Sequence, residues 1–292
     1  MPARRGRAGT DRMRMRIGAR LFDGPGPFIM GIVNATPDSF SDGGRYLDPA
    51  AAVAHALRLA EEGADLVDLG GESTRPGAPP VAEDEEIRRV VPVVEALRAR
   101  AFALPISIDT TKAAVARAAL AAGADLVNDV AGLADPALAR VVAEAGAPVV
   151  LMHSRGTPAD MQSRASYGDL VAEVRAELAE ALLRVAAAGV APERVILDPG
   201  IGFAKTAEHG FELLARLGEL RALGRPLLVG PSRKSFIGKV TGAPVGERLP
   251  GTLAAVTAAV LAGVELIRVH DVAAARQAAQ VAAAIRDAPR TS

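Results

Sequence analysis

Three residues with the chemistry to hold a flat, nitrogen-rich ring follow short apolar runs. Asp109 ends the run ISID, Asn128 lies in LVND, and Asp198 ends VILD. A carboxylate can accept two parallel hydrogen bonds from the N–H groups of a ring edge, and a carboxamide can both donate and accept. The sequence therefore predicts a site for a heterocycle with amidine-like N–H donors. A general acid–base pair of Asp109 and Asp198 is the weaker alternative, because nothing in the sequence indicates that their pKa values differ.

A second group of residues has the chemistry of an anion site. Arg268 and His270 lie in the run LIRVH, and Asn34 ends FIMGIVN. Because arginine forms paired hydrogen bonds to phosphate oxygens, we expect a phosphate or diphosphate here. One carboxamide cannot hold Mg²⁺ alone, but magnesium usually keeps waters and leans on substrate phosphates. Asn34 together with diphosphate oxygens and water is therefore a candidate Mg²⁺ site.

Short apolar runs alternate with helical stretches from residue 28 onward. The runs are continuous and rich in Val, Ile and Leu, as in strands that are buried on both faces of a parallel sheet. The expected strands are Phe28–Asn34, Leu66–Gly70, Ile106–Asp109, Leu126–Asp129, Pro148–His153, Val195–Asp198, Leu227–Gly230 and Leu266–His270. The expected helices include Pro49–Glu62, Glu83–Arg100, Lys112–Ala122, Leu170–Ala188 and Thr252–Ala262. This alternation predicts an α/β fold, a single-domain (β/α)₈ TIM barrel. A doubly wound sheet, the competing fold, would normally have a Gly-rich phosphate loop after its first strand, and IVNATPDSF is not one.

Polar residues follow every one of these strands, at the end where such barrels bind their ligands. They are Asn34, Glu72, Ser73, Thr74, Asp109, Asn128, Asp129, His153, Asp198, Ser232, Lys234, Arg268 and His270. A single polar loop residue is more often satisfied by neighbouring backbone. Polar groups at all the strand ends, including both asparagines of the chain, instead predict one binding mouth.

Two of the loops after strands are unusually long. ATPDSFSDGGRYLD follows the first strand and GESTRPGAPPVAEDEE follows the second. Because both are rich in Gly, Pro, Ser and Asp, we expect mobile flaps over the site. Phe40 is expected to be exposed on the first flap, in a chain with only 3% aromatic residues.

The composition excludes several classes of protein. Thirty-four basic residues balance 34 acidic ones, which argues against a nucleic-acid or anionic-membrane partner. The chain has no cysteine, so it has no disulfide scaffold, thiolate metal site or cysteine nucleophile. No apolar run approaches the roughly 18–20 residues that span a bilayer.

Residues 1–21 are rich in arginine and lack the apolar core of a secretory signal. We therefore predict a cytoplasmic protein with a disordered basic extension over residues 1–21 and a barrel over residues 22–288.

A set of motifs along the chain resembles the dihydropteroate synthases, a family of pterin-binding TIM barrels. In order these motifs are IMGIVNATPDSFSDGG, VDLGGESTRPGA, SIDT, VNDV, VVLMH, LDPGIGFAKT, LLVGPSRKSFIG and IRVHDV. The likeness runs from about Phe28 to Ala284, and the first and seventh motifs are highly specific to this family. It implies a transferase of folate biosynthesis that condenses (7,8-dihydropterin-6-yl)methyl diphosphate with 4-aminobenzoate, releasing diphosphate and forming 7,8-dihydropteroate. It also implies Mg²⁺ as a cofactor and small molecules as substrates. A further implication is a homodimer that forms through barrel helices.

The resemblance also assigns residues to each part of the substrates. The residues that it assigns to the pterin are Asp109, Asn128, Met152, Asp198, Phe203 and Lys234. Those that it assigns to the diphosphate are Asn34, Thr74, Arg268 and His270, with Mg²⁺ at Asn34. Those that it assigns to 4-aminobenzoate are Phe40, Arg75, Pro76 and Ser232. The catalytic residues that it implies are Asp42, Lys234, Arg268 and His270, of which Asp42 is expected close to the reacting carbon.

Two departures from the family pattern and three competing functions stay open. Ala204 and Gly210 stand where relatives commonly have Gly and Asn. Ala204 is a mild change, whereas Gly210 is expected to weaken a helix cap by a few tenths to about 1 kcal/mol.

A non-catalytic pterin-binding paralogue should have lost a flap or the diphosphate residues. A methyltetrahydrofolate-binding barrel that serves a corrinoid methyltransferase would need neither flaps nor the Arg268–His270 pair. A Schiff-base aldolase would use Lys234 as its nucleophile.

Overall fold

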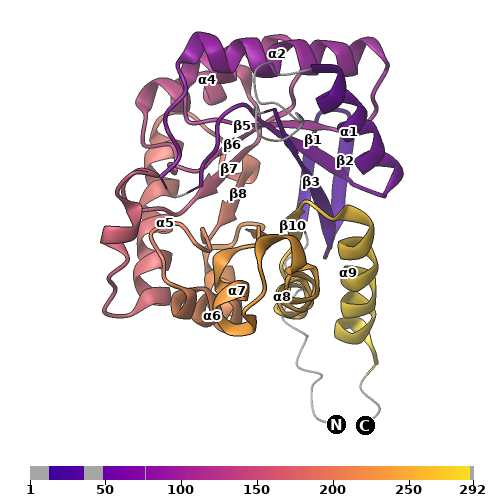
Figure 1. The fold of residues 1–292 in the computed structure, drawn as a ribbon. Coiled ribbons are helices and arrows are strands. Elements are labelled where there is room, and N and C mark those ends of the chain that lie inside the picture. Colours follow the sequence, from indigo (N-terminus) through magenta and orange to yellow (C-terminus); the bar gives the residue numbers. More distant parts are fainter. Residues whose placement is uncertain (1–12, 36–48, 76, 290–292) are drawn as a thin grey trace, which may run out of the picture.

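Parallel strands form a barrel in the computed structural model, which describes residues 13–35, 49–75 and 77–289. The strands are β3 (Phe28–Asn34), β4 (Leu66–Gly70), β5 (Ile106–Asp109), β6 (Leu126–Asp129), β7 (Val149–Met152), β8 (Val195–Asp198), β9 (Leu228–Val229) and β10 (Leu266–Val269). They are hydrogen-bonded in the order β8-β7-β6-β5-β4-β3-β10-β9, with all neighbours parallel. A parallel bridge between Leu197 and Leu227 joins the two ends of this order and closes the ring (Figure 1). The predicted barrel is confirmed.

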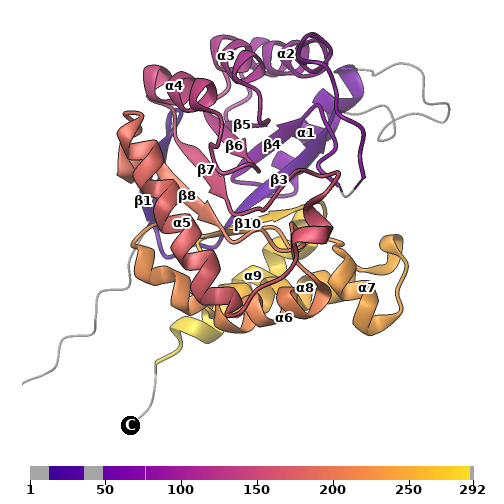
Figure 2. The same ribbon diagram turned by 90° about the vertical axis from the view of Figure 1, so that its left-hand side faces the viewer.

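Helices cover the outside of the barrel (Figure 2). They are α1 (Pro49–Glu61), α2 (Glu83–Ala99), α3 (Ala113–Ala121), α4 (Pro136–Ala145), α5 (Leu170–Ala187), α6 (Ala207–Arg216), α7 (Ser235–Thr241), α8 (Leu249–Leu261) and α9 (Val272–Asp287). The predicted Thr252–Ala262 begins three residues earlier, at Leu249, because Pro250 occupies the first turn, where proline needs no N–H partner. In the part of the chain that the structure describes, no helix is both long and apolar enough to cross a membrane.

A hairpin closes the bottom of the barrel and corrects the prediction that residues 1–21 are a disordered extension. β1 (Met13–Ile17) pairs antiparallel with β2 (Arg20–Gly24). Met13, Ile17 and Phe22 are buried against the first inward-facing residues of the barrel strands. Buried apolar residues alternate with exposed arginines along β1, which is the pattern of a half-buried strand. The high arginine content concealed this alternation, and the folded part includes Met13.

The alternation of side chains along each strand gives the barrel an apolar floor and a polar layer above it. The first inward positions are apolar and cluster with the hairpin, namely Met30, Leu66, Leu126, Val150, Ile196, Leu228 and Leu266. Two residues further along, the same face of a strand carries the polar residues Asp68, Asn128, Asp198 and Arg268. The residues between them face outward and pack against the helices. A period of two residues therefore brings polar side chains from four strands into one space.

Candidate active site

Arg268 lies at the centre of the polar layer. Its Nε donates to Oδ2 of Asp68 at 2.6 Å, and its Nη2 donates to Oδ2 of Asp109 at 2.8 Å. Nδ2 of Asn128 donates to the same oxygen of Asp68 at 2.9 Å. The sequence analysis separates a ring-binding group from an anion-binding group that includes Arg268. The structure joins the two groups through this guanidinium.

Several polar atoms of this layer have no hydrogen-bond partner. Among the described residues, the buried side-chain oxygens without one are Asp68 Oδ1, Ser107 Oγ, Asp109 Oδ1 and Glu86 Oε1. The first three lie on inward positions of β4 and β5. Because a buried polar atom without a partner costs free energy, such atoms indicate a missing ligand or water. Carboxylate oxygens can only accept, so a ligand that satisfies them must donate N–H or O–H groups.

Asp109 is an unusual carboxylate because of its surroundings. Burial raises the pKa of Asp109 to about 7, Arg268 opposes this effect, and the neighbouring charge of Asp68 adds to the rise. The side chain therefore changes between an acceptor and a donor near neutral pH. A ring edge that presents N–H donors would favour the ionised form.

Asp198 on β8 and Lys234 after β9 lie on the side of the barrel next to Arg268 on β10, and each interacts electrostatically with the other. Oδ1 of Asp198 accepts from the N–H of Gly200 at 2.7 Å, and burial raises the pKa of this carboxyl. The ammonium of Lys234 donates to the carbonyl of Ile201 and lies 4.9 Å from the centre of the Phe203 ring. Burial lowers the pKa of Lys234 to about 8, and the charge of Asp198 opposes that change. The structure thus brings together three of the residues assigned to the pterin.

His270 is neutral at physiological pH. Burial lowers its pKa to about 4, and the charges of Arg268 and Arg233 lower it further. The hydroxyl of Ser232 accepts from the backbone N–H of His270 at 3.2 Å and lies 2.8 Å from Nδ1 of the same residue. Arg233 is held by Asp271 through an ion pair. His270 can therefore offer an anion a hydrogen bond but not a positive charge.

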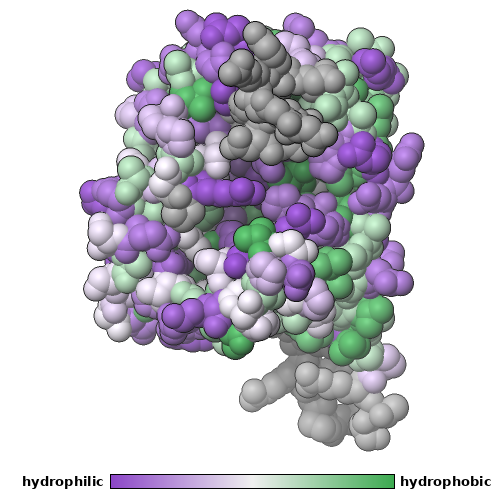
Figure 3. Space-filling view, viewed as in Figure 1, coloured by the Kyte–Doolittle hydropathy of each residue, from purple (hydrophilic) through white to green (hydrophobic). Residues whose placement is uncertain are grey.

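One cavity connects residues that the sequence analysis assigns to different parts of the ligand. It has a volume of about 140 Å³, and its lining includes Thr74, Asp109 and Phe203. Lys112 also lines this cavity, and its ammonium donates to Glu72 and Glu86. In Figure 3, hydrophilic residues surround a hollow near the middle of the visible face. Met152 occupies the last inward position of β7 and is buried beside Asp198.

The remaining predicted residues lie at the rim or outside the described part of the chain. Asn34 is half-buried at the end of β3, and Arg75 is exposed in the loop after β4. Phe40, Asp42 and Pro76 lie outside the described residues.

The single amide oxygen of Asn34 fits a magnesium ion that takes its other ligands from a substrate. No three His, Cys, Asp or Glu side chains gather at a metal-binding distance within residues 13–35, 49–75 and 77–289. Asn34 offers a hard oxygen ligand at the C-terminal end of β3. Since Mg²⁺ prefers oxygen and commonly keeps waters and substrate phosphates, this donor fits an ion bound together with diphosphate.

The two departures from the family pattern lie close together, Ala204 in the loop between β8 and α6 and Gly210 within α6. Ala204 has a φ of 49°, a left-handed conformation that favours glycine, so the change is more strained than the sequence suggests. Gly210 does not weaken the cap of α6, which corrects that expectation. Thr206 accepts from the N–H of His209 at 3.3 Å, and Nδ1 of His209 accepts from the N–H of Thr206 at 3.2 Å.

Asp68, the residue that joins Arg268 to Asn128, is not among the residues predicted from the sequence. The predicted residues lie at the ends of strands, whereas Asp68 lies in the middle of β4 and is fully buried. The signal was a charged residue within the apolar run LVDLG, two positions after the inward-facing Leu66. Buried carboxylates in such runs are rare unless they are paired.

Comparisons with known proteins agree with this geometry. The family model described as pterin binding enzyme matches residues 30–270. The chain is 50% identical to a dihydropteroate synthase of Synechocystis over 272 residues, which cover 92% of this chain and 94% of that protein. A Xanthomonas albilineans dihydropteroate synthase, solved with 4-aminobenzoic acid, is 48% identical with a TM-score of 0.89 and covers 95% of this chain and 100% of its own. The same enzyme solved with 7,8-dihydropteroate is 47% identical with a TM-score of 0.81, and the match covers 90% of this chain and 95% of that one. With its charged barrel mouth and these relatives, the chain belongs to the dihydropteroate synthases, a transferase family of pterin-binding enzymes.

Proposed function

We propose that this protein condenses (7,8-dihydropterin-6-yl)methyl diphosphate with 4-aminobenzoate, which releases diphosphate and forms 7,8-dihydropteroate. The observation that carries the proposal is the pair of unpartnered oxygens on Asp68 and Asp109, held in the barrel mouth by Arg268. The amino-pyrimidine edge of a pterin presents the N–H donors that these acceptors require. The Xanthomonas enzyme binds 4-aminobenzoic acid and 7,8-dihydropteroate, which correspond to one substrate and the product.

The pterin ring would lie in the polar layer, between the two charged pairs. Asp68 and Asp109 would accept from its N–H groups, and Asn128 can donate or accept beside them. Asp198 and Lys234 would meet the other edge of the ring, with Met152 and Phe203 against its faces. Fixing the ring on several sides orients its exocyclic methylene toward the rim, where the second substrate enters.

The reaction breaks the bond from the methylene carbon to the diphosphate oxygen and forms a bond from that carbon to the arylamine nitrogen. Arg268, Thr74 and the neutral His270 would hold the diphosphate, and their N–H and O–H donors stabilise the charge that grows on the leaving oxygen. Mg²⁺, held by Asn34 and the diphosphate, would supply further positive charge to the leaving group. The arylamine is neutral and nucleophilic at pH 7, and the proton that it loses passes to solvent or diphosphate. No covalent nucleophile is required.

The 4-aminobenzoate would bind at the rim, above the pterin. Arg75 lies exposed there, and Ser232 lies beside His270. We expect Phe40 and Pro76 to contact its ring, and Asp42 to approach the reacting carbon. Substitution of Phe40 by alanine should chiefly raise the KM for 4-aminobenzoate.

The proposal can be tested with purified protein, both substrates and Mg²⁺, by measuring dihydropteroate and diphosphate together. Asp198→Ala and Lys234→Ala should nearly abolish product formation while the circular dichroism spectrum stays unchanged. Lys239→Ala, on the exposed side of α7, is the matched lysine control and should retain full activity. If pterin binds but no diphosphate is released, the protein is a binding paralogue. If Asp198→Ala keeps wild-type turnover, the pterin assignment is wrong.

The environment of Lys234 argues against a Schiff-base aldolase. Burial lowers the pKa of Lys234 to about 8, which by itself would suit a Schiff-base lysine. Its Nζ, however, is held by a hydrogen bond to the carbonyl of Ile201. Borohydride added with substrate should therefore leave Lys234 unmodified in a mass spectrum, and a reduced adduct there would favour the aldolase.

We also propose that the protein is a homodimer that uses α7 and α8. Three large apolar side chains are exposed on these helices and the short 3₁₀ segment Val245–Glu247 between them. They are Val240, Val245 and Leu261, with 69%, 53% and 44% of their surface exposed. A subunit interface over these two helices would remove these side chains from water. Light scattering should give twice the mass of the chain, and Val240→Glu should reduce it to that of a monomer.

A further inference from the structure

The loop from Gly200 to Lys205 is held through its carbonyl groups. Four consecutive carbonyls, from Ile201 to Ala204, each accept a hydrogen bond from a side chain, three of them from outside the loop and one from Lys205 at its end. Lys234 donates to the carbonyl of Ile201, and Gln162 donates to that of Gly202 at 3.2 Å. Lys205 donates to Phe203 O at 3.0 Å, and the hydroxyl of Tyr167 donates to Ala204 O at 3.0 Å.

These tethers act on a backbone with an unusual run of left-handed residues. Gly200, Gly202 and Ala204 all have positive φ values, of 68°, 84° and 49°. Between them lies Phe203, whose side chain lines the cavity with Asp109. Because the two glycines leave the backbone many accessible conformations and Ala204 is held in a sparsely populated one, the tethers set the position of Phe203.

Lys205 connects this loop to a buried chain of hydrogen bonds. Its Nζ lies 2.8 Å from Nδ1 of His153, and Nε2 of His153 lies 3.0 Å from Oε2 of Glu177. An ammonium has no acceptor, so a charged Lys205 must donate to Nδ1, which places the ring proton on Nε2, facing Glu177. The three residues then form a relay from the carbonyl of Phe203 to α5. Lys205 and His153 are both only 3% exposed.

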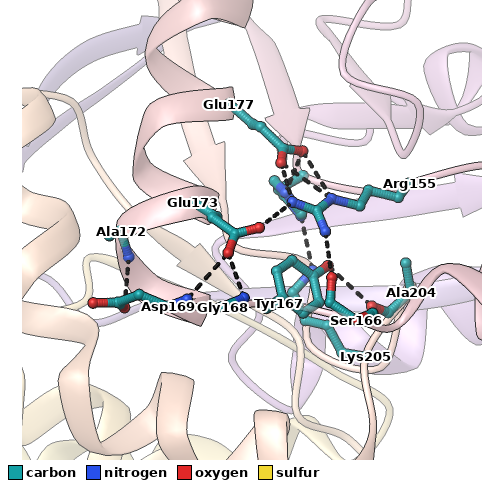
Figure 4. A network of polar contacts seen from close by, with 11 residues as sticks. Arg155, Ser166, Tyr167, Gly168, Asp169, Ala172, Glu173, Glu177, Ala204 and Lys205 are labelled. Carbon is teal, nitrogen blue, oxygen red and sulfur yellow. Dashed lines mark hydrogen bonds and ion pairs between the residues drawn. The ribbon is translucent and has the colours of Figure 1, made fainter.

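Arg155 fixes the outer end of the relay, as Figure 4 shows. It donates to Glu177 at 3.0 Å, to Glu173 at 2.7 Å and to the carbonyl of Ser166 at 2.7 Å. Its guanidinium lies 4.0 Å from the centre of the ring of Tyr167. Arg155 therefore orders both the carboxylate that receives the relay and the tyrosine that tethers Ala204.

The charge on Lys205 depends on the groups that face it. These are Asp198 on β8, Lys234 after β9, Arg155 after β7 and Glu177 on α5. His153 and the ring of Tyr167 complete its surroundings. Burial lowers the pKa of Lys205 to about 7, an effect that Lys234 and Arg155 increase and that Asp198 and Glu177 oppose.

A cavity lies on the outer side of the relay. A cavity of about 300 Å³ borders β7 and α5, and its lining includes His153 and Glu177.

We propose that Lys205 is a positioning residue for the pterin. As an ammonium, with His153 and Glu177 behind it, Lys205 holds Phe203 in the position that packs on the ring, and loss of its proton loosens the loop and weakens pterin binding. The proposal rests on the proposed function, because it presupposes that a pterin binds in this mouth. Lys205 acts on the ligand through the loop and not by contact.

The first test measures the Kd of 6-hydroxymethylpterin by calorimetry between pH 5.5 and 8.5. At pH 6, Lys205→Met should raise this Kd about tenfold, the effect of losing one charged hydrogen bond. The KM for 4-aminobenzoate should not change, because that substrate lies at the rim. Lys239→Met is the control and should bind like the wild type. Equal affinities of the wild type and Lys205→Met throughout the pH range would overturn the proposal.

The second test leaves the buried lysine in place. Glu177→Gln removes a charge that raises the pKa of Lys205, so the fall in pterin affinity with rising pH should begin at lower pH. Glu173→Gln is the matched control, because Glu173 contacts Arg155 but not His153, and it should leave the pH profile unchanged. Glu177 is partly exposed, so this variant should fold even where Lys205→Met does not. Equal pH profiles of the two variants would overturn the inference alone, whereas a wild type that binds no pterin would overturn the proposed function as well.

Discussion

Asp68→Asn should separate two tasks of the carboxylate that the sequence analysis missed. Oδ2 of Asp68 accepts from Arg268 at 2.6 Å and from Asn128 at 2.9 Å, whereas Oδ1 has no partner. Asparagine has the same shape, and its oxygen can replace Oδ2 and keep both bonds. The amide NH₂ then takes the position of Oδ1. The substitution thus removes a negative charge and turns an unpartnered acceptor, which we propose faces the pterin, into a donor.

The structure sets the size of the expected effect. A hydrogen bond to a charged group contributes about 1.5–3 kcal/mol, and 1.4 kcal/mol corresponds to a factor of ten. Pterin affinity should therefore fall about 10- to 100-fold. The fold should persist because Arg268 keeps Asp109, at 2.8 Å, as its partner. Asp68→Ala removes both bonds instead, and loss of one member of a buried ion pair should reduce the free energy of unfolding by about 3–5 kcal/mol.

The same substitution should change how pterin binding depends on pH. Asp68 is one of the charges that raise the pKa of Asp109 to about 7, after the larger effect of burial. Without this charge the pKa of Asp109 falls, so its ionised form persists to lower pH. The decrease in pterin affinity at acid pH, caused by protonation of Asp109, should therefore begin at a lower pH in Asp68→Asn.

Calorimetric titration with 6-hydroxymethylpterin, at several pH values, measures both effects. Asp65→Asn is the matched control, because it makes the same chemical change in the residue just before β4, at the floor of the barrel and away from the mouth. Asp65 accepts there from Arg20 at 2.6 Å and from the N–H of Ile29 at 2.8 Å. This control should lose stability but keep pterin affinity. A folded Asp68→Asn protein with wild-type affinity would refute the conclusion that Oδ1 accepts from the ligand.

Three further predictions concern stability. Burial lowers the pKa of His153 from 6.5 to about 3. Between these pH values the unfolded chain binds a proton that the folded chain does not, so the free energy of unfolding decreases as the pH is lowered. His153→Gln should make the melting temperature less sensitive to pH between these values. Ala204→Gly should relieve the φ of 49° and raise the free energy of unfolding by about 1 kcal/mol in a urea titration, and a lower value would contradict the strain. Ile17→Ala, in a fully buried position of the hairpin, should cost about 2–5 kcal/mol, whereas a disordered extension predicts no change.

The barrel strands could be predicted from the sequence because their physical signal is local. Each is a short apolar run followed by a polar loop, most of them come after a helix that ends in glycine, and six of the predicted runs begin at the first residue of the observed strand. Buried parallel strands need apolar residues on both faces, so such runs are distinct from the surrounding helices. The two runs that begin earlier than their strands, at Pro148 and Leu227, differ by one residue.

The floor and the interior of the site were harder to predict because they depend on contacts between distant segments. The hairpin is amphipathic only in relation to the barrel that it closes, and its arginines dominate the composition of the segment. Asp68 becomes a site residue only through Arg268, 200 positions later in the chain. Lys205 and His153 lie in recognisable motifs, but their pairing depends on how two loops pack. Pairings of this kind have no periodic pattern in the sequence.

The apolar floor and the unpartnered oxygens above it depend on each other. The strands β6, β8 and β10 are four residues long and have two inward positions each, of which the first is apolar and the second polar. Because Ile17 and Phe22 of the hairpin complete the floor, water is excluded from below, and burial raises the pKa of Asp109 and lowers that of Lys234. Buried carboxylate oxygens without partners reduce the stability of the free protein. In the complex that we propose, a pterin donates to them and removes this cost, so the groups that weaken the free barrel would be those that give it affinity for its ligand.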